Sequence, residues 1–145
     1  MTLNLKLLSK QKMDLKVFKL AANTKNHKLL NNYDYILKQK NSLCGDEITI
    51  SIKVKNKKIF KIGYICKSCI YTQATASMLA IFFQNKSLEE IEDMILELNK
   101  FCMKKTQKLP KNLSFFSKII NGQNLARKDC LLLPFNTIKK MINVL

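Results

Sequence analysis

The feature that most constrains the fold is a strict alternation of apolar and polar residues near position 50. Ile48, Ile50 and Ile52 are separated by single polar residues, which is the two-residue period of a strand with one buried face. This strand covers residues 47–54. The polar turn "KNKK" follows it, and "IFKIGYI" then returns as its antiparallel neighbour. The upstream segment "YDYILKQ" can supply another strand. The sequence therefore predicts a small antiparallel sheet of three strands.

The other segments predict helices. An N-terminal helix is expected over residues 1–20, and "CIYTQATASMLAIFF" predicts a helix whose small residues allow close packing. A capping-box pattern at Ser87 starts a further helix with an apolar stripe. A last helix is expected within residues 130–145, with Pro134 in its first turn. A few strands followed by a run of helices indicate an α+β fold, and the length suits one domain spanning residues 1–145.

The charge of the chain is strongly basic, with a formal net charge of +16. Such a charge can indicate a nucleic-acid partner. However, 25 of the 26 basic residues are lysine and only Arg127 is arginine, whereas arginine is the usual choice for bidentate phosphate and base recognition. We therefore favour codon bias as the cause. No apolar run is long enough to cross a membrane and no signal peptide is evident, so we expect a cytoplasmic protein.

The five cysteines are the side chains with the widest range of possible chemistry. An odd number of cysteines without an export signal argues against a disulfide framework. Cys102 falls on the apolar stripe of its predicted helix and is expected in the core. Cys69 stands where the last strand ends and a helix begins, and the dipole at a helix N-terminus favours the thiolate.

The predicted hairpin brings several of these side chains to one edge of the sheet. Cys44 and Asp46 precede one strand and Cys69 follows the next, so the three can meet there, and Cys130 can close the site from the last helix. Three thiolates and a carboxylate form a plausible tetrahedral set for zinc. Two alternatives stay open: unrelated core cysteines, or a Cys-x-x-Cys pair of Cys66 and Cys69 serving as half of a zinc knuckle or as a redox pair.

Three segments in this order resemble the U-type iron–sulfur cluster assembly family, which comprises NifU N-terminal domains, IscU and SufU. "LCGDEITISIKV" is similar to the Cys-Gly-Asp segment of that family, and "CIYTQATASMLA" to its second-cysteine helix. "ARKDC" resembles the third-cysteine segment of the SufU branch, and the long gap between the second and third cysteines also fits SufU. The chain thus looks like a divergent SufU-like member.

The resemblance implies an α+β fold with helices packed on a small antiparallel sheet, and a site made of Cys44, Asp46, Cys69 and Cys130. In the family, this site holds zinc or a transient [2Fe–2S] cluster. Sulfur arrives as a persulfide from a cysteine desulfurase, and the cluster goes to apoproteins. Cys44 is our candidate for the persulfide acceptor, and Arg127 could steer the persulfide or form an ordinary surface ion pair.

Several functions remain open at this level. We favour a scaffold over an enzyme. The alternative is a zinc-dependent sulfurtransferase that relays persulfide, and the outsider is a basic nucleic-acid-binding protein with a structural zinc.

The chain also departs from the family at defined positions. Cys66 and Ser68 replace glycines, and Asp129 stands where IscU members have a histidine before the third cysteine. The Leu-Pro-Pro-Val-Lys segment of IscU members, which binds a chaperone, is missing. Cys66 is therefore an added thiol near the expected site, whose role the sequence leaves open.

Overall fold

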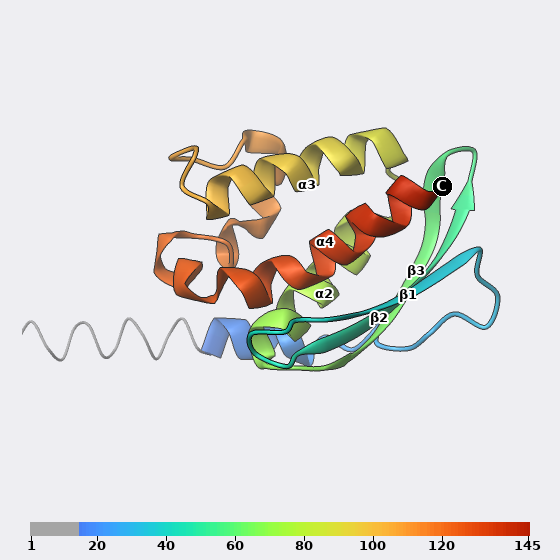
Figure 1. The fold of residues 1–145 in the computed structure, drawn as a ribbon, viewed down its shortest axis with the longest axis horizontal. Coiled ribbons are helices and arrows are strands. Elements are labelled where there is room, and N and C mark those ends of the chain that lie inside the picture. The colour runs from blue at the N-terminus through green and yellow to red at the C-terminus, as the bar shows by residue number, and fades with distance from the viewer. Residues whose placement is uncertain (1–14) are drawn as a thin grey trace, which may run out of the picture.

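The computed structural model describes residues 15–145 and contains one sheet of three antiparallel strands. The strands are β1 (Tyr35–Lys40), β2 (Glu47–Lys55) and β3 (Lys58–Lys67), in the spatial order β1-β2-β3. The helices α2 (Ile70–Phe82), α3 (Leu88–Cys102) and α4 (Lys128–Val144) follow them. Two 3₁₀ segments, η1 (Lys111–Lys118) and η2 (Gly122–Arg127), connect α3 to α4. The predicted α+β fold with a three-stranded antiparallel sheet is confirmed (Figure 1).

The β2–β3 hairpin sets the register that the site depends on. Asn56 and Lys57 in its turn both have positive φ, as the two-residue turns that match the twist of a hairpin require. In the resulting register Ile48 pairs with Cys66 and Glu47 pairs with Lys67. The residue before β2 therefore lies opposite the residues that follow β3.

The core lies between the inner face of the sheet and the helices. Ile48, Ile50 and Ile52 are each at most 1% exposed, so the alternation in the sequence marks the buried face as expected. Helix α4 is the central helix because it contacts α2 and α3 as well as β1 and β2 (Figure 1). Within residues 15–145, no helix is long and apolar enough to cross a membrane.

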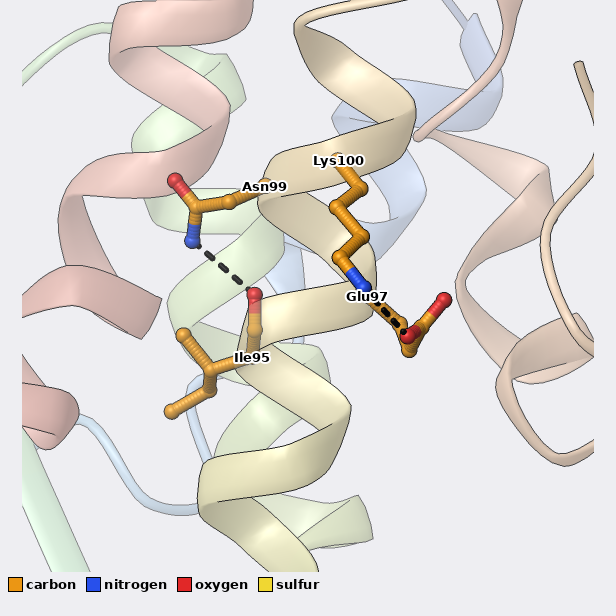
Figure 2. A network of polar contacts seen from close by, with 4 residues as sticks. All are labelled: Ile95, Glu97, Asn99 and Lys100. Atoms are coloured by element: carbon orange, nitrogen blue, oxygen red, sulfur yellow. Dashed lines mark hydrogen bonds and ion pairs between the residues drawn. The ribbon is translucent and has the colours of Figure 1, made fainter. Parts of the chain in front are cut away.

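Helix α3 covers α4 on the side away from the sheet. Its predicted cap is present, since the Ser87 hydroxyl accepts a hydrogen bond from the Glu90 N–H at 3.1 Å. Figure 2 shows the ion pair between Lys100 and Glu97 on this helix, at 3.4 Å. It also shows the Asn99 amide, which donates to the Ile95 carbonyl at 2.9 Å. The same amide also reaches the Asn136 side chain on α4 at 2.9 Å, which ties the two helices together.

Helix α4 starts earlier than the sequence predicted, and only part of the predicted N-terminal helix falls within the described residues. Helix α4 begins at Lys128, so Pro134 lies inside it and not in its first turn. The expectation was wrong because buried residues on both sides of Pro134 hold the helix against the core, at the cost of one helical hydrogen bond. Of the predicted N-terminal helix, residues 15–20 are helical, and the earlier part lies outside the described residues.

Gly63 in β3 is required by close backbone packing. The loop that precedes β1 crosses the outer face of the sheet, where the Leu30 N–H donates to the Ser51 hydroxyl at 3.0 Å. A Cβ added to Gly63 would collide with the carbonyl oxygen of Lys28 in this loop. Only glycine lets this loop lie directly on the strand.

Candidate metal centre

Cys69 occupies the N-cap of α2, at the junction that the sequence predicted. Its side chain makes no capping hydrogen bond, and the first turn of α2 contains no acidic residue. The cap is instead supplied by Asp46, which stands directly before β2. The Asp46 Oδ1 atom accepts a hydrogen bond from the Cys69 N–H at 3.2 Å. A carboxylate from another element thus satisfies and neutralises the positive end of the helix.

Asp46 is the polar centre of the site and is only 7% exposed. Its Oδ2 atom accepts a hydrogen bond from the Thr72 hydroxyl at 2.8 Å and lies 3.3 Å from the Cys69 Sγ atom. Burial acts to raise the pKa of this carboxyl, but the hydrogen bonds from Thr72 and Cys69 outweigh it and hold the pKa below 3.8. Asp46 is therefore ionised at neutral pH and available as an oxygen ligand.

The turn between β1 and β2 places Cys44 beside this carboxylate. The Gly45 N–H donates to the Asn41 carbonyl and the Asn41 N–H donates to the Asp46 carbonyl, both at 2.8 Å. Gly45 has a φ of +77°, which side-chain-bearing residues seldom adopt. This glycine reverses the chain so that Cys44 is exposed while Asp46 is buried.

Cys130 reaches the same place from the first turn of α4 and is 6% exposed. Its Sγ atom lies 3.8 Å from the Cys44 Sγ atom. The ligand atoms of Cys44, Asp46 and Cys130 all lie within 4.8 Å of one another. Burial raises the pKa of the Cys130 thiol, and the neighbouring Cys69 and Cys44 raise it further. Crowding of thiols in this way is relieved when a cation binds to them as thiolates.

The structure thus brings all four predicted ligand residues together, with one distinction among them. Cys44, Asp46 and Cys130 form the compact group, and Cys69 is joined to it through its contact with Asp46. Thiolates with one carboxylate suit zinc or iron in tetrahedral coordination. The donor set therefore fits the groups that the sequence suggested.

Arg127 ends η2 close to the site, but among the described residues it has no surface ion pair of the kind that the sequence left open. None of the ion pairs found in residues 15–145 includes it. Its guanidinium carbon lies 5.3 Å from the ring centroid of Tyr71, in the first turn of α2. This is a cation–π contact between the segment that leads to Cys130 and the helix that begins at Cys69.

Neither of the two remaining cysteines belongs to the compact ligand group. Cys102 is 1% exposed in the core, as predicted. Cys66 is partly buried near the end of β3, where burial raises the pKa of its thiol to about 12. Its backbone N–H donates to the His27 Nε2 atom at 3.2 Å. Cys66 is thus a protonated thiol at neutral pH and does not belong to the group of close ligand atoms.

Sequence reasoning missed Thr72, which is fully buried. Its hydroxyl contacts both Asp46 and the Cys130 carbonyl oxygen. A signal was present, because a residue three positions after a helix N-cap lies on the same side of the helix as the cap. A threonine at this position is well placed to support the site.

The fold and this geometry define a class of protein: a small α+β domain that gathers thiols and a carboxylate, a group able to hold a metal, at one edge of its sheet. The model of the NifU-like N terminal domain family matches residues 12–122. The chain belongs to this family of U-type iron–sulfur cluster assembly scaffolds. The matched residues include Cys44, Asp46 and Cys69, whereas Cys130 lies beyond them.

Individual relatives agree with this assignment. The iron–sulfur cluster assembly scaffold protein IscU from Thermotoga maritima is 30% identical over 105 residues, which cover 71% of this chain and 72% of that protein. The NifU-like N-terminal structure from Brucella abortus superposes with a TM-score of 0.76 at 18% identity, covering 88% of this chain and 90% of that one. A SUF-system scaffold protein from Fervidobacterium islandicum gives 0.74 at 22% identity, with coverage of 86% and 92%. The two structures support the fold alone.

Proposed function

We propose that Cys44, Asp46, Cys69 and Cys130 hold a nascent [2Fe–2S] cluster as the cargo of this protein. The observation that carries the proposal is the group of ligand atoms from Cys44, Asp46 and Cys130 within 4.8 Å of one another, beside the Cys69 thiol. In this proposal a cysteine desulfurase supplies the sulfur, apoproteins receive the cluster, and the reaction takes place in the cytoplasm, where thiols stay reduced.

Cys44 is the side chain best placed to receive sulfur, because it is the exposed member of the group. Its thiolate attacks the outer sulfur of the persulfide on the desulfurase. A new S–S bond forms on Cys44 while the S–S bond to the desulfurase cysteine breaks, and that cysteine leaves as a thiolate. The exchange moves a sulfur atom and needs no further oxidant or reductant.

Asp46 gives the site a position that exchanges readily. A carboxylate is a hard ligand among soft thiolates and binds iron or zinc less firmly than they do. Its oxygens also accept hydrogen bonds from Cys69 and Thr72, and these bonds compete with a metal for the carboxylate. We therefore expect Asp46→Ala to retain a reconstituted cluster longer than the wild type, and faster loss of the cluster would contradict this role.

We propose that Arg127 steers the incoming persulfide or contacts a carboxylate of the desulfurase. The support is its exposed position at the end of η2 and its contact with Tyr71. The expected result of Arg127→Ala is weaker stimulation of the desulfurase by this protein, with unchanged metal binding. Loss of the metal instead would assign Arg127 a purely structural role.

The second candidate is a zinc-dependent sulfurtransferase, which the exposed thiol of Cys44 and the zinc-compatible donor set both favour. The two candidates differ in what the protein contains after purification without oxygen. Iron with an equal amount of acid-labile sulfide supports the scaffold, whereas about one zinc per chain supports the sulfurtransferase.

The matched variants are Cys69→Ser, which removes a proposed ligand, and Cys102→Ser, which changes a buried cysteine outside the site. The metal is expected to be lost only from Cys69→Ser. If neither the wild type nor the variants contain metal, the proposed metal site is refuted. A basic nucleic-acid-binding protein would instead show steeply salt-dependent RNA retention, which we do not expect.

A further inference from the structure

The Thr72 hydroxyl contacts two acceptors that belong to two proposed ligand residues. Its Oγ1 atom lies 2.8 Å from the Asp46 Oδ2 atom and 3.0 Å from the Cys130 carbonyl oxygen. Thr72 is fully buried, so water does not compete for this group. A hydroxyl has one proton to donate, and the two acceptors therefore share a single donor.

The Cys130 carbonyl is free to accept this proton because of Pro134. In a regular α-helix the carbonyl of residue 130 accepts a hydrogen bond from the N–H of residue 134. Pro134 lies inside α4 and has no N–H. Thr72 thus supplies from α2 a donor that α4 itself lacks. Because of the proline, the Cys130 carbonyl is a second acceptor for the hydroxyl proton.

We propose that Thr72 is a positioning residue that controls how easily Asp46 moves on and off a bound metal. The inference rests on the proposed function, in which Asp46 is a ligand. When no metal is bound to Asp46, the Thr72 hydroxyl donates to its carboxylate, as it does in this structure. When Asp46 binds the metal, the same hydroxyl turns to the Cys130 carbonyl, so the buried hydroxyl has an acceptor in both states.

The direction of the effect follows from the two hydrogen bonds. A bond to an ionised carboxylate is stronger than one to a neutral carbonyl. Thr72 therefore stabilises the metal-free carboxylate more than the metal-bound one, and it promotes release. A threonine that only held α2 and α4 together would have the opposite effect, because removing it would loosen the site and speed the loss of metal.

The test uses the full chain, made metal-free and then loaded with one equivalent of Zn²⁺. Zinc affinity is measured by competition with a chelator, and the rate of zinc release is followed with a chromogenic indicator. Thr72→Val removes the hydroxyl and keeps the shape of the side chain. We expect it to bind zinc about fivefold more tightly and to release it more slowly, while the metal-free protein becomes less stable to urea.

Three further variants make the test specific. Thr72→Ser keeps a hydroxyl and should restore wild-type release. Thr75→Val removes a hydroxyl that is equally buried on the same helix but donates to the Tyr71 and Thr72 carbonyls, and it should leave zinc affinity unchanged. Combined with Asp46→Ala, the Thr72→Val change should have no effect on zinc affinity.

Pro134→Ala tests the second acceptor and does not depend on the folding of the Thr72 variants. It returns an N–H donor to the Cys130 carbonyl, so the hydroxyl gains less by turning there, and zinc should be released faster than from the wild type. Faster release from Thr72→Val, or slower release from Pro134→Ala, would overturn the proposal. A wild type that binds no zinc would refute the ligand set itself, whereas normal binding with unchanged release in both variants would refute only the role of Thr72.

Discussion

Replacing Asp46 with alanine should destabilise the metal-free protein even though it removes a buried charge. The carboxylate accepts hydrogen bonds from the Cys69 N–H at 3.2 Å and from Thr72 at 2.8 Å. Thr72 keeps an acceptor after the substitution, because the Cys130 carbonyl lies 3.0 Å away. The Cys69 N–H has no such alternative among the hydrogen bonds of residues 15–145, and the N-terminus of α2 loses the carboxylate that caps it.

The magnitude follows from these two losses. A partly buried N–H without an acceptor costs about 1–2 kcal/mol, and a carboxylate at a helix N-terminus contributes about 0.3–1 kcal/mol. We expect Asp46→Ala to lower the free energy of unfolding by about 2 kcal/mol, which corresponds to a fall in Tm of about 4–8 °C. Asp46→Asn keeps an acceptor for the Cys69 N–H and should lose about half as much.

The assay is urea unfolding of the metal-free protein in the presence of a reductant and a chelator. Asp93→Ala is the control, since Asp93 is exposed on α3 and forms none of the ion pairs found in the described part of the chain. It should change stability by less than about 0.5 kcal/mol. If Asp46→Ala falls within the same range, the capping of α2 by this carboxylate contributes nothing and the reasoning is refuted.

The pH dependence of the same comparison is a second check. The pKa of Asp46 is lowered in the folded protein, because its hydrogen bonds outweigh the effect of burial. Its contribution to stability is therefore fully present above the unfolded pKa of 3.8 and is lost as the pH falls through the lower folded value. The difference in free energy of unfolding between wild type and Asp46→Ala should stay constant above pH 3.8 and shrink as the pH falls below that value.

Three other predictions follow from the fold. Gly63→Ala should destabilise the protein by about 1–3 kcal/mol in urea unfolding, because the added Cβ meets a loop carbonyl, whereas Gly122→Ala, with open space around it, should not. Iodoacetamide at pH 8, followed by peptide mass spectrometry, should label Cys44 first, since it is exposed, and Cys66 slowly, because burial raises the pKa of that thiol to about 12; equal rates would contradict the buried position of Cys66. Burial also raises the pKa of Cys102 from 9.0 to about 11. The protonated thiol therefore contributes fully to the free energy of unfolding below pH 9, and this contribution is lost at about 1.4 kcal/mol per pH unit between pH 9 and pH 11. In urea unfolding, the stability of Cys102→Ala should decline less steeply over this range than that of the wild type.

Most of the sheet and much of the site could be predicted because their signals are local. The apolar alternation at Ile48, Ile50 and Ile52 marks a buried face, and it does so in the structure. The hairpin then requires the start of β2 to lie near the end of β3, which is why Asp46 and Cys69 were expected together and lie in contact. Because a short turn joins the two strands, such contacts can be predicted from the spacing of the residues along the chain.

The contribution of α4 to the site was harder to predict from the sequence, because it depends on packing between distant segments. The sequence suggested that Cys130 closes the site, but the 3.8 Å contact with Cys44 depends on how α4 crosses the sheet and α2. Pro134 illustrates the limit, since its local preference for a helix start is overridden by the burial of its neighbours. The burial of Cys66, which keeps its thiol protonated, is likewise a property of the assembled core.

What the sequence by itself determined is the set of chemical groups and the order in which the strands and helices present them. The three-strand meander, the cap of α3 and the thiol at the start of α2 all follow from residues within a few positions of one another. Only the tertiary structure decided that the single hydroxyl of Thr72 lies between the Asp46 carboxylate and the Cys130 carbonyl. The reason is physical: a hydrogen bond depends on distances of a few tenths of an ångström, and such distances between remote segments are set by the packing of the whole core.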